Sequence, residues 1–222
     1  MPQKNTRLLG GNPLIAYTIA SALKSRLLSK IILSTDDSYI ASIGKERGIE
    51  VPFMRPTELA RDDTPTLPVL QHAVRWFEER GERYEGVCLL QPTNPFRPAS
   101  WIDGCIARFW ITQADSVVTV LPVPAEFNPH WVYFDGPAKS LRLSTGERDP
   151  IPRRQLLPRA WHREGSVYVC SRSVLMGENS LFGQRLVGYR VSDRRSANID
   201  TPADWAEAER RLAGDARLSV FA

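Results

Sequence analysis

Short apolar runs alternate with amphipathic segments along most of this chain. The apolar runs, each long enough for one buried strand, lie at 30–35, 86–91, 115–123, 165–170 and 186–191. The segments with apolar residues at helical spacing lie at 13–26, 38–47, 66–80, 99–111, 171–177 and 202–212. Because a helix that follows a strand carries the chain back to the start of a parallel neighbour, this order predicts an α/β domain with a largely parallel sheet and helices on both faces.

Residues 124–164 interrupt this alternation. They are rich in proline and arginine and hold only short apolar runs, such as HWVYF at 130–134. A length of 222 residues suits a single domain. We therefore interpret the stretch as a small β-rich excursion within one domain over 1–222, used either in dimerisation or to cover a substrate.

The net charge of +4 and the pI of about 9.1 raise the question of a nucleic-acid partner. Six arginines lie within 142–163, but aromatic residues are not interleaved with them as single-strand binding requires. The charge is better explained by a positive cleft for a small anionic substrate, with no nucleic acid as partner.

No apolar run reaches the roughly 18 residues of a membrane helix. The first 20 residues also lack the order of basic, apolar and cleavage regions that marks a secretory signal. We therefore expect a cytoplasmic protein with no membrane partner. The spacing of the three cysteines indicates neither a disulfide framework nor a zinc site, and Cys88 and Cys170 are expected in the core.

The segment QPTNPFR at 91–97 directly follows a strand-like run, and ligands of such sheets bind beyond the carboxyl ends of strands. Its prolines limit the backbone, so the loop is able to hold Gln91, Thr93 and Arg97 at fixed positions over a ligand. The arginine fork suits a carboxylate or a phosphate. The alternative is a proline-rich connection in which Thr93 bonds only to backbone.

The segment NIDTPADW at 198–205 contains a helix start, with Thr201 as N-cap, Pro202 in first position and Asp204 in third position. Asp200 lies just before the cap and is free to face a cleft. Together with the amide of Asn198, its carboxylate is suited to hold Mg²⁺ if phosphates and water supply the remaining ligands.

Taken together, several segments resemble the acylneuraminate cytidylyltransferases, the CMP-sialic acid synthetase family. The matching pieces are PQKNTRLLGGNPLIAYTI (2–19), KIILSTDD (30–37), VPFMRPTELARDDTPT (51–66), LLQPTNPFR (89–97), DSVVTV (115–120), REGSVYV (163–169) and SANIDTPADW (196–205). The resemblance implies a Rossmann-like nucleotidyltransferase fold and a homodimer built with the excursion. It also implies a Mg²⁺-dependent reaction in which CTP and an acidic 2-keto sugar give a CMP-sugar and pyrophosphate.

On the nucleotide side, the resemblance assigns Lys4 and Asn5 to the end of a phosphate-binding loop, with Lys4 also taking part in catalysis. Arg55 and Thr66 match nucleotide-contacting positions. Asp200 matches a metal-binding carboxylate with a catalytic role, and Asn198 stands beside it in the metal motif.

On the sugar side, the resemblance assigns Gln91 to substrate binding and catalysis. Tyr168 lies at the sugar, and Leu181 with Phe182 matches an apolar pair that receives the acyl group of the sugar. Arg154 is assigned as a partner for the sugar carboxylate.

The chain departs from the family pattern in two ways. A buried strand and a loop like ARGGSKG precede the stretch matched by PQKN in the family, so we expect this strand and loop to be missing here and the activity to be impaired. Where the family has the metal motif Asp-x-Asp, this chain has Asn198-Ile199-Asp200. Where Asn-Gly is common in the family, it has Glu164-Gly165. N-acylneuraminate, legionaminate or a similar nonulosonate is the expected sugar. The alternatives are 3-deoxy-manno-octulosonate, or an impaired homologue that binds nucleotide or sugar.

Overall fold

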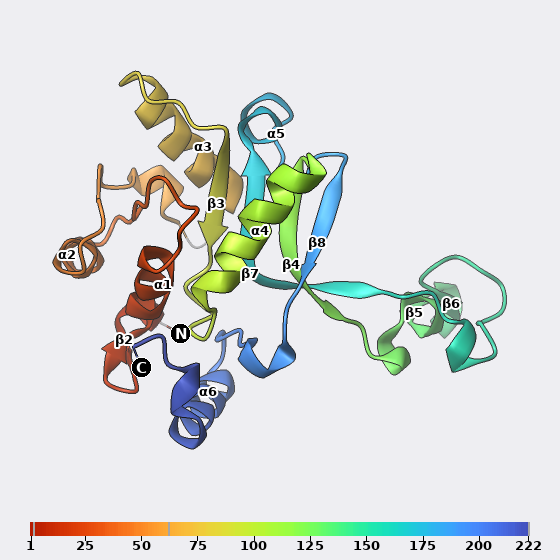
Figure 1. Ribbon diagram of the computed structural model, residues 1–222. Helices are drawn as coiled ribbons and strands as arrows, with labels where there is room; N and C mark the ends of the chain where they lie inside the picture. Colours follow the sequence, from red (N-terminus) through yellow and green to blue (C-terminus); the bar gives the residue numbers. More distant parts are fainter. Residues whose placement is uncertain (2, 62, 222) are drawn as a thin grey trace.

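The computed structural model describes residues 1, 3–61 and 63–221. Its main sheet has the strand order β3-β7-β4-β8, with β3 over Gly86–Leu90, β7 over Trp161–Ser171, β4 over Ser116–Pro122 and β8 over Leu186–Arg190. β3, β4 and β8 share one direction, but β7 runs antiparallel between β3 and β4 (Figure 1). The expectation of a largely parallel sheet is thus corrected to a mixed one. β7 is reversed because the chain enters it from the excursion instead of through a crossover helix.

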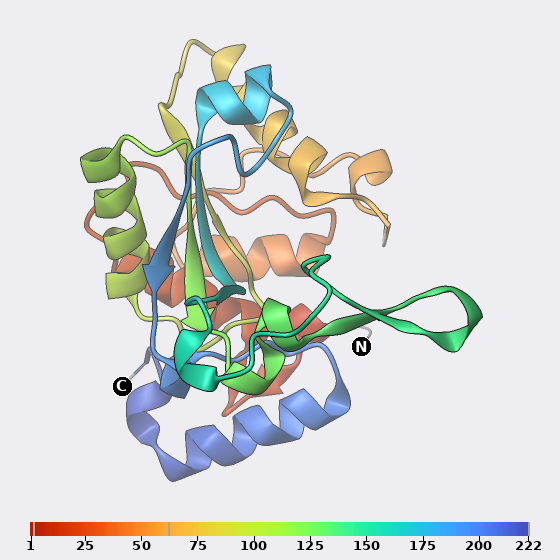
Figure 2. The same cartoon turned by 90° about the vertical axis from the view of Figure 1, so that its right-hand side faces the viewer.

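Helices cover both faces of this sheet, as expected (Figure 2). Alternate side chains of β7 separate the two layers: Val167 and Val169 pack with α4 (Ala99–Thr112). Tyr168 and Cys170 face the other side, where Cys170 packs with α5 (Arg172–Gly177) and α3 (Thr66–Glu78). Successive side chains of a strand point to opposite faces, so one strand serves two cores.

The helix boundaries follow local sequence signals. α1 (Leu14–Leu23) begins directly after Pro13, and α2 (Ser38–Glu46) is capped by Asp37, which accepts hydrogen bonds from two backbone amides. α2 ends before Gly48, whose φ of +81° is a conformation that glycine adopts without strain. α6 (Pro202–Gly214) begins with the predicted capping box of Thr201 and Asp204.

The remaining elements are short. A tight turn at Gly10 and Gly11, both at positive φ, joins β1 (Leu8–Leu9) to its antiparallel partner β2 (Asn12–Pro13). The 3₁₀ turns are η1 (Lys4–Thr6), η2 (Thr57–Leu59), η3 (Ala125–Phe127), η4 (Pro129–Trp131), η5 (Pro137–Lys139), η6 (Arg154–Leu156), η7 (Asp193–Arg195) and η8 (Ala216–Leu218). Within the described residues, no helix is long and apolar enough to cross a bilayer.

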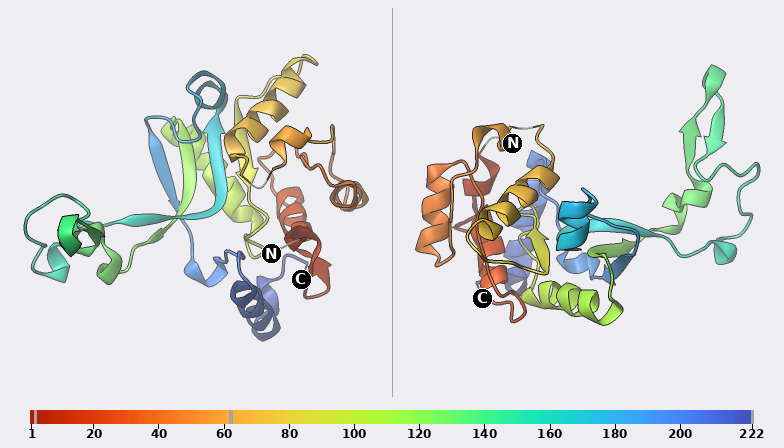
Figure 3. Two further views of the ribbon diagram at one scale, coloured as in Figure 1. Left: turned by 180° about the vertical axis from the view of Figure 1, so that it is seen from behind. Right: turned by 90° about the horizontal axis from the view of Figure 1, so that it is seen from above.

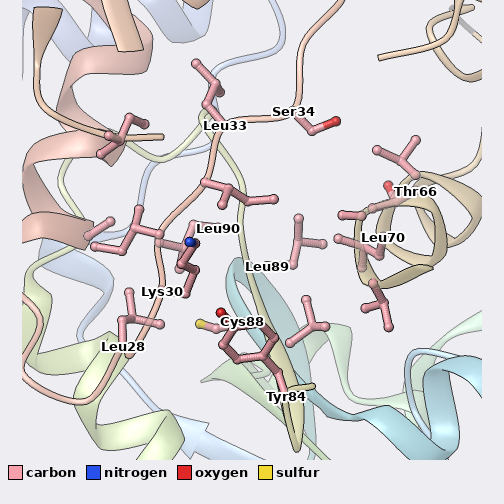
Figure 4. A pocket seen from close by; sticks show the side chains of 18 of the residues that line it. Leu28, Lys30, Leu33, Ser34, Thr66, Leu70, Tyr84, Cys88, Leu89 and Leu90 are labelled. Atoms are coloured by element: carbon pink, nitrogen blue, oxygen red, sulfur yellow. The ribbon is translucent and has the colours of Figure 1, made fainter. Parts of the chain in front are cut away.

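Residues 30–35 do not form the buried strand that the sequence predicts. They make only isolated parallel bridges, Ile32 to Glu50 and Thr35 to Met54. On the opposite side they face a cavity of about 920 Å³, which is lined across from them by Cys88, Leu89 and Leu90 of β3 (Figure 4). Pairing on one side alone explains why the segment stays half-buried and irregular.

The excursion leaves the body at the end of β4 and returns into β7 (Figures 1 and 3). It contains an antiparallel hairpin of β5 (Tyr133–Asp135) and β6 (Leu141–Leu143). We call residues 123–160 the arm. Several of its large apolar side chains are solvent-exposed, namely Phe127, Tyr133, Phe134, Leu141 and Leu156.

Candidate active site

An ion pair joins the start of the chain to the segment before α6. Lys4 Nζ lies 2.9 Å from Asp200 Oδ1, and Asn198 Nδ2 donates to Asp200 Oδ2 at 2.5 Å. The Asp200 side chain is 56% exposed, whereas that of Lys4 is 22% exposed. The structure thus brings together three residues that the sequence assigns to phosphate and metal binding.

The cap of α6 fixes the backbone at Asp200. Asp204 Oδ2 accepts hydrogen bonds from the amides of Asp200, at 3.0 Å, and Thr201, at 2.7 Å. These bonds favour the charged carboxylate and lower the pKa of Asp204. Asp204 is a capping residue, as predicted, and the Asp200 carboxylate takes no part in the cap.

Arg97 does not face a ligand, which corrects one expectation for the loop 91–97. Its side chain is fully buried, and its guanidinium donates to the carbonyls of Gln91 and Ser166 at 3.0 and 2.9 Å, and to Thr18 Oγ1 at 2.9 Å. Burial lowers the pKa of Arg97 to about 10, so the group stays charged at neutral pH. Arg97 therefore stabilises the loop that carries Gln91 instead of binding a substrate anion.

The loop 91–97 also contacts the segment that carries Asp200. The amide of Ile199 donates to the carbonyl of Thr93 at 3.0 Å. Thr93 thus bonds through its backbone, and Gln91 and Asp200 belong to two connected segments at one edge of the sheet.

Three of the nucleotide candidates and the sugar candidate Gln91 line the cavity. Asn5, Arg55, Thr66 and Gln91 all border it, and Figure 4 shows Thr66 at the start of α3. Arg55 is held by Ser34, whose Oγ accepts from Nε at 3.2 Å and whose carbonyl accepts from a terminal nitrogen. Burial lowers the pKa of Arg55, an effect that the nearby Asp36 opposes.

The side chain of Asn5 makes one end of the cavity polar. Its Oδ1 is buried and has no hydrogen-bond partner among the described residues. A buried acceptor without a donor is unfavourable in the free protein, so a donor supplied by an occupant of the cavity would stabilise the site.

The sugar candidates are only partly assembled. Tyr168 is buried in β7, and Phe182 packs on the cluster that contains it. Burial raises the pKa of Tyr168, so its hydroxyl is protonated at neutral pH. Leu181 packs in a different cluster, on Cys170 and its neighbours. Arg154 lies on the arm and is exposed.

Sequence reasoning missed the role of Glu164. Its carboxylate accepts hydrogen bonds from Asn94, Ser166 and Ser196. The only signal in the sequence is an acidic residue beside Gly165, between the arm and a strand, and such a residue is more often solvated. Its contacts depend on segments that are distant in sequence.

The donor set around Asp200 fits a divalent cation only in part. No group of three or more His, Cys, Asp or Glu side chains with suitable placement occurs among the residues that the structure describes. One exposed carboxylate and one amide oxygen suit Mg²⁺ when phosphate oxygens and water complete its octahedron. The residues present thus fit a metal that arrives with a phosphate ligand.

Residues 1–189 match the sequence profile of a family described as cytidylyltransferase. The chain belongs to the cytidylyltransferase family. The CMP-N,N'-diacetyllegionaminic acid synthase of Legionella pneumophila is 30% identical, over 96% of this chain and 90% of that protein. The N-acylneuraminate cytidylyltransferase of Escherichia coli is 26% identical over 91% of this chain and 46% of its own length. This cytidylyltransferase is therefore a CTP-dependent nucleotidyltransferase of the N-acylneuraminate type.

Solved structures support the same fold. A CMP:2-keto-3-deoxy-manno-octonic acid synthetase solved with CTP superposes with a TM-score of 0.72 at 15% identity, over 96% of this chain and 93% of that one. A 4-diphosphocytidyl-2C-methyl-D-erythritol synthase from Anaerococcus prevotii gives a TM-score of 0.66 at 13% identity, over 93% and 88% of the two chains. The nucleotidyltransferase fold expected from the sequence is confirmed.

Proposed function

We propose that this cytidylyltransferase transfers CMP from CTP to an acidic 2-keto nonulosonate, with N-acylneuraminate, legionaminate and related sugars as the substrate class. The observation that carries the proposal is the joining of Lys4, Asn198 and Asp200 next to a cavity lined by Asn5, Arg55, Thr66 and Gln91. The names of relatives at 25–30% identity support the sugar class, because they include legionaminic, N-acylneuraminic and pseudaminic acid enzymes.

In the proposed reaction the anomeric hydroxyl oxygen of the sugar bonds to the α-phosphorus of CTP, and the bond to pyrophosphate breaks. Lys4 and Arg55 supply positive charge toward the phosphates, and Asn5 and Thr66 supply polar contacts to the nucleotide. Gln91 and Tyr168 position the sugar, with Leu181 and Phe182 toward its acyl group. Positioning and charge stabilisation of this kind are the main means of catalysis in phosphoryl transfer.

Asp200, with Asn198, is proposed to hold Mg²⁺ in the presence of CTP. Bound Mg²⁺ would neutralise charge on the phosphate oxygens. Lys4 and Asn198 now donate to the two carboxylate oxygens of Asp200, so both groups are expected to shift their contacts when nucleotide and metal bind.

The cavity beside β3 is proposed as the place of one further strand, joined ahead of residue 1 and followed by a phosphate-binding loop. β3 pairs only with β7 among the described strands, and the segment 31–35 faces β3 across the cavity. The cavity of about 920 Å³ extends along β3 and is lined there by Val87, Cys88, Leu89 and Leu90.

The position of η1 favours this arrangement. A strand parallel to β3 would end near the C-terminal end of β3, where Figure 1 marks the N-terminus of the chain, and Asn5 of η1 lines the cavity. Lys4 and Asn5 would then continue the loop. Because loop amides cradle phosphates, we expect such a loop to strengthen the binding of CTP.

The arm is proposed to build a homodimer. Its exposed side chains Phe127, Phe134, Leu141 and Leu156 would be covered by a second copy. Arg154 would then be a partner for the sugar carboxylate from a position that the isolated chain leaves exposed. Sedimentation analysis tests this, since a monomer at micromolar concentration would contradict it.

Pyrophosphate release from CTP and Mg²⁺ tests the function, with a panel of nonulosonates and 3-deoxy-manno-octulosonate. The assay is run on the 222-residue chain and on a form extended by strand and loop. Calorimetry with CTP separates a binding homologue from an enzyme: tight binding without turnover in the extended form contradicts the proposed activity.

A further inference from the structure

Glu164 connects three segments that carry the candidate residues. Ser166 donates to Oε2 twice, from its amide at 3.0 Å and from Oγ at 2.6 Å. Ser196 Oγ donates to Oε1 at 3.0 Å, and Asn94 Nδ2 donates to the same oxygen. Both carboxylate oxygens are therefore occupied by protein donors, so Glu164 does not need a ligand to satisfy it.

Each donor lies close in sequence to a proposed site residue. Asn94 follows Gln91 in the loop after β3, Ser166 precedes Tyr168 in β7, and Ser196 precedes Asn198 in the segment before α6. The bond from the Ile199 amide to the Thr93 carbonyl closes this group into a ring of contacts.

Charge adds to the geometry. Arg97 is fully buried and bonds to the Ser166 carbonyl, while the amide and hydroxyl of the same Ser166 bond to Glu164. Among the described residues, no carboxylate lies within ion-pair distance of Arg97. Glu164 acts on the pKa of Arg97 in the direction that keeps the guanidinium charged. A buried cation needs a nearby anion, and Glu164 supplies it through Ser166.

We propose that Glu164 is a positioning residue that sets where Asp200 lies relative to Gln91, and so the spacing between the metal and the sugar during transfer. The inference rests on the proposed function for its catalytic consequence. The physical link between the three segments stands on the hydrogen bonds alone, whatever reaction the protein catalyses.

The link is tested by amide hydrogen exchange in Glu164→Gln, with Glu209→Gln as matched control. Glu209 also accepts a side-chain hydrogen bond, from Trp205 Nε1 at 2.9 Å, but it accepts none from Asn94, Ser166 or Ser196. We expect the Ile199 amide to exchange about tenfold faster in Glu164→Gln, because a charged acceptor is lost. The Leu33 amide, bonded to the Glu50 carbonyl, is expected to stay unchanged as an internal reference. Unchanged exchange at Ile199, or equal acceleration at Leu33, would overturn the proposal.

Steady-state kinetics of the extended enzyme test the catalytic consequence. We expect Glu164→Gln to lower kcat about tenfold while KM for CTP changes less than about twofold, because Arg55 and Thr66 belong to segments that Glu164 does not contact. A rise in KM for CTP with kcat unchanged would overturn the positioning role. If the unsubstituted enzyme turns over no sugar, the proposed function fails and the exchange experiment alone decides this inference.

Discussion

Lys4 and Asp200 form an ion pair with Nζ and Oδ1 2.9 Å apart, although they stand near opposite ends of the sequence. Asp200 is more exposed than Lys4, so the pair lies at a surface where phosphate and metal have access. An exposed pair of this kind contributes little to stability. The position of the ion pair, beside a cavity that Asn5 lines, is therefore better explained by function than by stability.

We predict that Asp200→Asn lowers turnover about a hundredfold, because the metal and phosphates lose their charged partner. Pyrophosphate release measured over a range of Mg²⁺ concentrations checks this. Glu79→Gln removes an equal charge at an exposed helix end and should leave turnover unchanged. Equal turnover in the Asp200 variant and the unsubstituted protein would contradict the role of Asp200.

Arg97→Met is predicted to destabilise the fold by about 2–5 kcal/mol, because the carbonyls of Gln91 and Ser166 and the hydroxyl of Thr18 lose a charged donor. Arg80→Met is the control, since Arg80 is half exposed and stacks on Trp76, an arrangement worth less than about 1 kcal/mol. Urea unfolding of both variants gives the comparison. If Arg97→Met lowers the free energy of unfolding no more than Arg80→Met does, Arg97 has no structural role.

Local signals in the sequence predicted the elements well, and long-range contacts were the source of the errors. The α6 cap was predictable because Thr201, Pro202 and Asp204 act within one turn. Arg97 was expected over a ligand because the sequence does not show that Thr18 and Ser166 surround it. Likewise, the antiparallel direction of β7 follows from the return of the arm, which no local pattern specifies.

Asp215 gives a prediction for acid stability. Hydrogen bonds from Arg217 lower its pKa from 3.8 to about 2 in the folded protein. A lowered pKa in the folded state stabilises the protein above pH 3.8, and this contribution is lost as the pH falls toward about 2. Asp215→Asn should therefore lower Tm at pH 6, with the difference from the unsubstituted protein shrinking across that window. A difference in Tm that is constant from pH 6 to pH 2 would contradict this.

Cys88 reports on the cavity. Its side chain lines the cavity (Figure 4) and is partly exposed, whereas Cys105 is buried. Burial raises the pKa of Cys88 to about 12, so alkylation should be slow but still faster than at Cys105. A strand that fills the cavity should protect Cys88, which peptide mass spectrometry after alkylation would show as a lower rate in the extended form. The same alkylation rate in both forms would mean that the cavity stays open.

The central claim is tested most directly by ³¹P NMR of CTP, Mg²⁺ and a nonulosonate with the protein extended by strand and loop. The account predicts that the triphosphate signals disappear while one phosphodiester and one pyrophosphate signal appear in equal amounts, and only when the sugar is present. Unchanged CTP with every sugar of the panel, from a folded protein that binds CTP, would contradict it.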